Sequence, residues 1–185
     1  ELMVKYAKLN KKVVRLKGGD PIIFGRGGEE AEFLKSFKVK YEIVPGITSG
    51  IGSATYAGIP LTHRKYASSA VFVTGHEDPE KNEEIVKWKK LAKSVDTIVI
   101  MMGLSRIGII SKQLIDGGMK KSTPVAVIQN GTTPKQKMIV GTLTNIASKV
   151  KKEKMSPPAN IIIGEVVKLH KTIGWKKWVK KKPLP

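Results

Sequence analysis

The sequence predicts an α/β fold, because short apolar segments with the length of buried strands alternate with helical patterns along the chain. Most of the predicted strands are followed by small, flexible residues, as is usual at the carboxyl ends of strands in open α/β sheets. The chain has 185 residues, of which 41% are hydrophobic, and this is enough for one large domain or two small ones. We therefore expect mainly parallel sheets with a ligand site at one edge.

The first half of the chain opens on residues 1–9, which have the pattern of the second half of a helix and no N-cap signal. An α/β domain that opens inside a helix is expected to lack its first strands, so we interpret this half as the remainder of a truncated domain. The elements predicted after it are a strand at 13–16, a helix at 29–37, a strand at 41–44 and a helix of small residues at 49–57.

The second half starts a new series of strands and helices. Apolar runs rich in Val and Ile predict strands at 70–74, 97–101, 124–128, 137–140 and 160–167. Apolar residues at helical spacing predict helices at 83–93, 105–115 and 143–152. A change in composition near residues 62–66 predicts a domain boundary. The expected organisation is the remainder of an N-terminal α/β domain (1–66), a C-terminal α/β domain (67–170) and a basic tail (171–185).

The charge balance is strongly basic, with 34 Lys and Arg against 15 Asp and Glu and a formal net charge of +19. Such a field attracts polyanions, either nucleic acid or a small polycarboxylate. Most of the lysines are spread along the chain, as on an ordinary solvated surface, and only 149–154 and 176–182 form dense runs. The apolar runs are too short to span a bilayer and the first residues have no secretory pattern. Cysteine is absent, which excludes disulfides and thiolate metal sites and fits a cytoplasmic setting.

Glycine-containing clusters follow the predicted strands at 18–21, 45–49, 74–77, 102–103 and 129–132. Glycine permits backbone conformations that other residues avoid, and it allows a ligand to approach closely. A single cluster of this kind is no more than a turn, but their recurrence predicts a crevice for a flat or extended ligand. The common nucleotide loops do not match, because 25–28 lacks the third glycine of a dinucleotide loop and no Walker A pattern occurs. The three histidines lie far apart in the sequence, so no metal site is expected.

A family resemblance rests on segments 14–21, 24–30, 44–49, 56–64, 73–76, 102–104, 129–136 and 158–164. They include Lys17-Gly18-Gly19-Asp20-Pro21 and Pro60-Leu61-Thr62-His63-Arg64. In content and order they resemble the signature of the uroporphyrinogen-III C-methyltransferases, a branch of the tetrapyrrole methylase family. The resemblance covers the chain from about residue 3 to residue 170.

The resemblance implies a two-domain tetrapyrrole methylase fold with S-adenosylmethionine bound between the domains. It implies cofactor contacts by Gly18, Gly19, Asp20, Ile23, Thr48, Ser49, Met102, Gly131 and Ala159. A buried adenine needs apolar walls and a few backbone hydrogen bonds, and these residues can provide both. The alternative for Met102 is plain core filling.

The activity implied is the methylation of uroporphyrinogen III to precorrin-2 by way of precorrin-1, on the route to sirohaem and cobalamin. A methyl group passes from a sulfonium to a pyrrole carbon, so catalysis depends on orientation more than on a strong base. Arginine is the natural partner of the substrate carboxylates, and Arg64 is the first candidate. Arg26 is the second, with a surface ion pair as its alternative. His63 either moves a proton or caps a turn.

The sequence also departs from the family. The opening loop rich in glycine and proline, and the region with the family's proton-handling residues, are absent, so no catalytic residue is assigned and the activity of this chain alone is in doubt. Gly50 and Gly52 stand where the family usually has alanine. The resemblance further implies a homodimer. The alternatives are another precorrin or cobalt-precorrin methyltransferase, and a basic nucleic-acid-binding module, which the low aromatic content of 6% disfavours.

Overall fold

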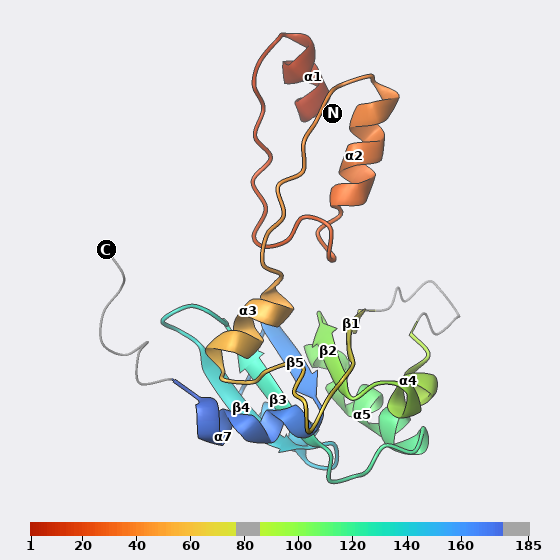
Figure 1. Cartoon of the computed structure of the whole chain (residues 1–185), viewed down its shortest axis with the longest axis vertical. Coiled ribbons are helices and arrows are strands. Elements are labelled where there is room, and N and C mark those ends of the chain that lie inside the picture. The colour runs from red at the N-terminus through yellow and green to blue at the C-terminus, as the bar shows by residue number, and fades with distance from the viewer. Residues whose placement is uncertain (77–85, 176–185) are drawn as a thin grey trace. The chain divides into compact units, whose positions relative to one another are not determined.

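The computed structural model describes residues 1–76 and 86–175 (Figure 1). Contacts within the chain divide it into two units, residues 1–49 and residues 50–185, and each is described by itself. This division falls before the boundary predicted after residue 66, and the domain limits of 1–66, 67–170 and 171–185 stay a prediction. None of the helices in the described ranges has the length and apolar character needed to cross a membrane.

The first unit contains two helices, α1 (Leu2–Lys8) and α2 (Gly27–Ser36). The predicted helix at 29–37 is confirmed in α2. An ion-paired cluster links α2 to the segment before it. Arg15 Nε lies 3.2 Å from Glu30 Oε1 and Lys17 Nζ lies 3.1 Å from Glu30 Oε2. The two cations lower the pKa of the Glu30 carboxyl, chiefly through the hydrogen bond from Lys17.

The strands predicted at 13–16 and 41–44 are wrong, since neither segment has strand structure. Val14 is 79% exposed and Val44 is 73% exposed, although both belong to runs with high strand propensity. A strand is stabilised by hydrogen bonds and side-chain pairs with a neighbouring strand, and within the described residues no segment pairs with either run. The local sequence favours extended backbone, but a ladder also needs a partner.

The second unit is built on one five-stranded sheet. The strands are β1 (Ala70–Thr74), β2 (Thr97–Met101), β3 (Pro124–Gln129), β4 (Lys137–Thr142) and β5 (Ala159–Ile163), in the spatial order β1-β2-β5-β3-β4 (Figure 1). Only β1 and β2 pair in parallel, and the other three pairs are antiparallel. The α/β class is confirmed, whereas the expectation of mainly parallel pairing is wrong for this sheet. The reason is that β3 and β4 form a hairpin and β5 runs in the reverse direction between β2 and β3.

The helices in the described part of this unit are α3 (Ser49–Tyr56), whose first residue is the last of the first unit, α4 (Trp88–Ser94), α5 (Ile107–Asp116), α6 (Ile146–Lys152) and α7 (His170–Ile173), with short 3₁₀ turns at Leu104–Arg106 and Glu165–Leu169. The predicted helix at 83–93 lies partly outside the described residues, as does part of the predicted tail. The last strand ends at Ile163 instead of 167, because Gly164 adopts a φ of 145° and turns the chain into the second 3₁₀ segment.

The sheet is covered on both faces. Alternate strand residues such as Ile98, Val125 and Ile161 pack with α4, α5 and α6 in one buried cluster. The residues between them, including Ala126 and Ile162, pack in a second cluster with Ala54 and Ala57 of α3. This alternation follows from the two-residue period of a strand. The unit is therefore a three-layer structure, and α3 lies on the face opposite α4–α6.

Asp96 fixes the entry into β1 and β2. Its Oδ2 atom accepts hydrogen bonds from the backbone N–H groups and the hydroxyl groups of Ser68 and Ser69, at 2.9 to 3.1 Å. These hydrogen bonds, with that from the Ser68 N–H the largest contribution, lower the pKa of the Asp96 carboxyl. A carboxylate that accepts several hydrogen bonds keeps its charged form in the folded state.

Replacing Asp96 with asparagine is therefore expected to cost about 0.5–1 kcal/mol of stability at pH 7, because an uncharged amide accepts more weakly and water screens this exposed position. The folded-state pKa lies below the unfolded value of about 3.8, so this stabilisation is present above that pH and disappears as the pH falls through the folded pKa. Urea unfolding of the wild type and Asp96→Asn at a series of pH values should show two curves that converge on acidification. Asp116→Asn is the matched control, since the Asp116 carboxylate has no hydrogen bond within the described ranges. An unchanged difference between wild type and Asp96→Asn at pH 3 and pH 7 would contradict the prediction.

Candidate functional site

The loops at one edge of the sheet form the candidate site of the second unit. The strand register pairs Thr74 with Met101, Met101 with Asn160, and Gln129 with both Ala159 and Lys137. The ends of β1, β2 and β3 and the starts of β4 and β5 thus lie at the same edge. The clusters at 75–76, 102–103 and 130–132 continue directly from these positions. For this unit, the predicted convergence of the glycine-containing clusters is confirmed.

Met102 and Gly103 follow β2 at this edge. Met102 adopts a left-handed backbone with a φ of 56° and the residue is 56% exposed, so it does not fill the core. The neighbouring loop comes very close, because a Cβ atom on Gly75 would lie 2.3 Å from the Cα atom of Gly103. The glycines let the two loops touch through their backbones and leave the Met102 side chain as an apolar group at the edge.

The second loop at this edge surrounds Gly131. The flanking residues Asn130 and Thr132 are both left-handed, with φ of 49° and 68°. The Asn130 N–H donates to the Pro158 carbonyl at 3.0 Å, which places the loop beside the residue before Ala159. The Gln136 side chain accepts from the Thr132 N–H at 2.8 Å and donates to the Tyr56 carbonyl at 3.3 Å. The loop is thereby attached both to β5 and to α3.

Two residues that the sequence analysis did not select hold this edge together. Asn160 Nδ2 donates a hydrogen bond of 3.1 Å to Ser53 Oγ, and both residues are buried. Ser53 also lies against the loop, since a Cβ atom on Gly131 would be 2.4 Å from the Ser53 Cβ atom. The signal that could have identified Asn160 is an amide side chain within a strand that is otherwise apolar. No comparable signal marks Ser53, which lies among small residues in α3.

In the first unit, Asp20 joins two of the predicted cofactor segments. Its Oδ1 accepts from the N–H groups of Ile22 at 2.8 Å and Ile23 at 2.9 Å, and its Oδ2 accepts from the Gly46 N–H at 3.1 Å. These backbone hydrogen bonds, with that of Ile23 the largest contribution and that of Gly46 the next, lower the pKa of the Asp20 carboxyl. The carboxylate is thus used to shape the loop, and it brings residues 18–23 against the turn at 45–46.

The backbones of these two segments are also in close contact. A Cβ atom on Gly46 would lie 2.6 Å from the Gly19 carbonyl oxygen, and one on Gly19, which has a φ of 149°, would lie 3.2 Å from the Ile47 carbonyl oxygen. Thr48, next in the chain, is 2% exposed. Gly18, Gly19, Asp20, Ile23, Thr48 and Ser49 all belong to the first unit, whereas Met102, Gly131 and Ala159 belong to the second. The structure therefore brings the predicted residues together within each of two groups.

The three predicted substrate-binding residues differ in their surroundings. Arg64 is exposed and has no hydrogen bond or ion pair within residues 1–76 and 86–175. Arg26 forms an exposed ion pair with Glu29, with Nε 3.3 Å from Oε1. His63 Nδ1 accepts a hydrogen bond of 3.2 Å from the Lys65 N–H, and its ring lies 5.0 Å from the Tyr66 ring. Of the two alternatives for His63, the geometry favours the turn cap.

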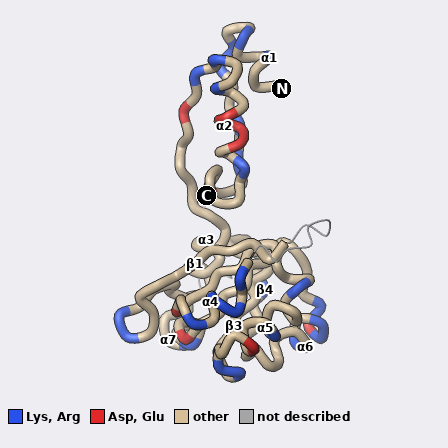
Figure 2. Tube along the Cα trace, turned by 90° about the vertical axis from the view of Figure 1, so that its right-hand side faces the viewer, with Lys and Arg blue, Asp and Glu red and all other residues tan. Residues whose placement is uncertain are grey.

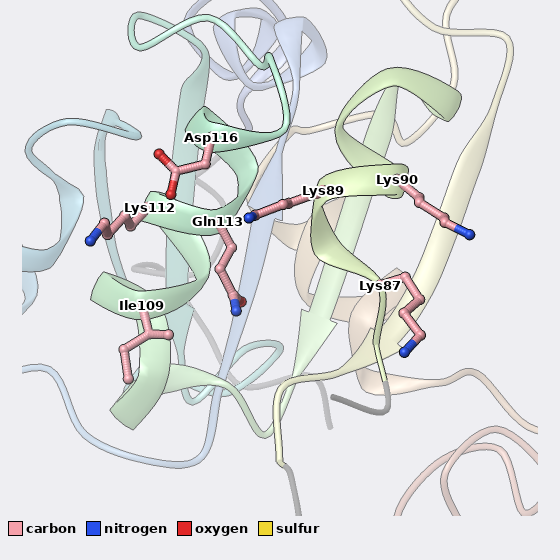
Figure 3. A pocket seen from close by; sticks show the side chains of 7 residues that line it. All are labelled: Lys87, Lys89, Lys90, Ile109, Lys112, Gln113 and Asp116. Atoms are coloured by element: carbon pink, nitrogen blue, oxygen red, sulfur yellow. The ribbon is translucent and has the colours of Figure 1, made fainter. Parts of the chain in front are cut away.

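A hollow of about 590 Å³ lies between α4 and α5, and it is lined by Lys87, Lys89, Lys90, Ile109, Lys112, Gln113 and Asp116 (Figure 3). The lysine side chains do not converge, because Lys90 and Lys112 project in opposite directions. Basic positions also surround α4, α5 and α6 more widely (Figure 2). This face adds to the positive field of the protein, but it presents no convergent anion site. In the described ranges, no group of three or more His, Asp or Glu residues could hold a metal ion.

Comparisons with known proteins agree with this geometry. The family described as Tetrapyrrole (Corrin/Porphyrin) Methylases matches residues 1–147. The S-adenosyl-L-methionine-dependent uroporphyrinogen III methyltransferase of Methanosarcina barkeri is 51% identical over 174 residues, which cover 94% of this chain and 68% of that protein. A siroheme synthase of Actinobacillus pleuropneumoniae is 50% identical over 175 residues, and this match spans 95% of the chain but only 35% of the synthase.

Among solved structures, the chain is similar to the uroporphyrin-III C-methyl transferase of Thermus thermophilus complexed with S-adenyl homocysteine. The TM-score is 0.77 and the identity is 37%, with 91% of this chain and 72% of that chain covered. The similarity therefore extends over both units of the chain.

Proposed function

Because the chain belongs to the tetrapyrrole methylase family, we propose that it methylates uroporphyrinogen III to precorrin-2, by way of precorrin-1, in the synthesis of sirohaem and cobalamin. The methyl donor is S-adenosylmethionine, whose sulfonium supplies an activated methyl group, and the product is S-adenosylhomocysteine. The observation that carries the proposal is the gathering of Met102, Gly131 and Ala159 at one sheet edge, in a chain half identical to a uroporphyrinogen III methyltransferase.

The residues at this edge fit an adenine ring. The exposed side chain of Met102 offers a polarisable apolar surface. Gly131 and Ala159 leave room for a flat ring beside backbone groups that can donate and accept hydrogen bonds. We assign these three residues to the adenine end of the cofactor.

The residues of the first unit fit the polar part of the cofactor. The Asp20 carboxylate shapes the loop that carries Gly18, Gly19 and Ile23 and holds it against the turn before Thr48 and Ser49. We expect backbone groups of this loop and the hydroxyl groups of Thr48 and Ser49 to face the cofactor. Such groups suit an amino acid carboxylate and a ribose. Asp20 therefore acts through the loop that it holds, and its role is to position backbone donors.

Arg64 is the residue that best fits the carboxylates of the substrate. It is exposed and has no internal partner in the described part of the chain, so its guanidinium can form a bidentate pair with an acetate or propionate group. Arg26 has a smaller role, because its guanidinium already forms an exposed ion pair with Glu29. His63 supports the turn that presents Arg64. The net charge of +19 helps to attract a substrate with many carboxylates.

We further propose that the protein acts as a cytoplasmic homodimer. The resemblance to the methyltransferase family supports the dimer, and the absence of cysteine fits a reducing compartment. Sedimentation of the purified protein tests the assembly, and a mass equal to one chain would contradict it.

Calorimetry with S-adenosylhomocysteine, followed by a methylation assay on uroporphyrinogen III, tests the function. We expect measurable binding heat and the absorbance of precorrin-2. Binding without product from uroporphyrinogen III would favour a methyltransferase that acts on a later precorrin. The absence of binding, together with salt-sensitive affinity for DNA or RNA, would support a nucleic-acid-binding module instead.

A further inference from the structure

Ser53 is a residue of α3 that contacts both β5 and the Gly131 loop. It is 1% exposed, and its hydroxyl oxygen accepts the hydrogen bond from Asn160, 107 residues further along the chain. Asn160 is the second residue of β5, where the register places it opposite Met101 of β2 and Ile128 of β3. This hydrogen bond thus connects α3 to β5. In the sheet, β5 lies between β2 and β3, the strands that lead into the Met102 and Gly131 loops.

Gly131 lies so close to Ser53 that no side chain larger than hydrogen fits between them. A Cβ atom on Gly131 would lie 2.4 Å from the Ser53 Cβ and 3.0 Å from the Ser53 Cα. The Gly131 backbone therefore rests directly on α3 at the residue that Asn160 holds. Any rotation of α3 that releases the hydrogen bond also moves the surface on which the loop lies.

We propose that Ser53 and Asn160 are positioning residues that set the Gly131 loop and Ala159 for cofactor binding. They act through the loop and need no contact with the cofactor. This proposal rests on the proposed function, since it assumes that the loop binds the adenine end of S-adenosylmethionine. A buried hydrogen bond between two neutral side chains suits this task, because it has a directional geometry that apolar packing lacks.

The test compares the full chain with Ser53→Ala, Asn160→Leu and the double variant. We expect Ser53→Ala to weaken S-adenosylhomocysteine binding about 5- to 30-fold and to lower the melting temperature, because the buried Asn160 amide loses its hydrogen bond to the Ser53 hydroxyl. In the double variant both polar groups are gone, so the melting temperature should recover. Affinity should stay low in the double variant, because the directional link is still absent. KM for uroporphyrinogen III should change little in any of the variants.

Ser111→Ala is the matched control. Ser111 lies in α5 and is 4% exposed, and among the described residues its buried hydroxyl has no hydrogen-bond partner. We expect this change to leave affinity and loop dynamics as in the wild type. An unchanged affinity in Ser53→Ala would overturn the proposal, and so would an affinity that recovers together with the melting temperature in the double variant.

Hydrogen exchange of the unliganded protein separates this proposal from the proposed function. Faster exchange of the amides at 130–132 in Ser53→Ala, but not in Ser111→Ala, would support the positioning role even if the wild type bound no S-adenosylhomocysteine. In that case the proposed function would fail and the positioning of the loop would stand. Equal exchange of these amides in all variants would overturn the positioning role.

Discussion

Replacing Gly131 with alanine is expected to weaken S-adenosylhomocysteine binding about 5- to 150-fold, which corresponds to about 1–3 kcal/mol of overpacking. The added methyl group would lie 2.4 Å from the Ser53 Cβ, a separation that folded proteins do not tolerate. The loop must therefore move away from α3, and the flanking residues Asn130 and Thr132, which already have left-handed backbones, must adjust with it. Calorimetry measures the affinity, and thermal unfolding reports the cost to the fold.

Gly108→Ala is the control for this substitution. Gly108 lies in α5, where a Cβ atom would make an ordinary contact of 3.7 Å with the Ala147 Cβ. An alanine in a helix is favoured over glycine by about 0.5–1 kcal/mol, so this variant should be slightly more stable and should bind as the wild type does. Equal affinities of Gly131→Ala and the wild type would exclude the Gly131 loop from the cofactor site.

Replacing Arg64 with alanine is expected to lower kcat/KM for uroporphyrinogen III about 10- to 100-fold, mainly by raising KM. The physical reason is the loss of a charge-assisted pair with a substrate carboxylate, which contributes about 1.5–3 kcal/mol. Because Arg64 is exposed and forms no ion pair or hydrogen bond in the described residues, its removal should leave the melting temperature unchanged. Steady-state kinetics and calorimetry with S-adenosylhomocysteine separate the two effects.

Two variants make the Arg64 result specific. Arg64→Lys keeps the charge but not the planar fork, and we expect an intermediate KM. Lys112→Ala removes the same charge from the α4–α5 face and controls for the general field of the protein. A similar loss of kcat/KM in Lys112→Ala and Arg64→Ala would show that net charge, and not a specific contact, is responsible.

Local sequence was sufficient for much of the second unit. The strands at 70–74 and 97–101 match the structure, because apolar runs of five residues between turn signals have few alternatives to a buried strand. The clusters around Gly75, Gly103 and Gly131 were also identified from the sequence, because glycine often marks a place where two backbones come into close contact. Their convergence at one edge follows from strand direction alone for β1, β2 and β3.

Other features depended on contacts between distant segments. The runs at 13–16 and 41–44 have strand propensity but no partner in the described part of the chain, and propensity alone does not make a ladder. The Asp20 carboxylate accepts hydrogen bonds from the backbone N–H groups of Ile22, Ile23 and Gly46, which residue type and spacing do not reveal, and its contact with the cofactor stays a prediction. A sequence does not reveal which acceptor a given N–H group will find.

The sequence by itself determined the family, the apolar strands and the glycine-containing loops, because these depend on residue type and spacing along the chain. Only the tertiary structure decided that β5 runs antiparallel between β2 and β3, and that Ser53 meets Asn160 and Gly131. Ser53 and Asn160 are 107 residues apart in the sequence, and they meet only when the chain packs. The local sequence around each residue does not distinguish this partner from many others.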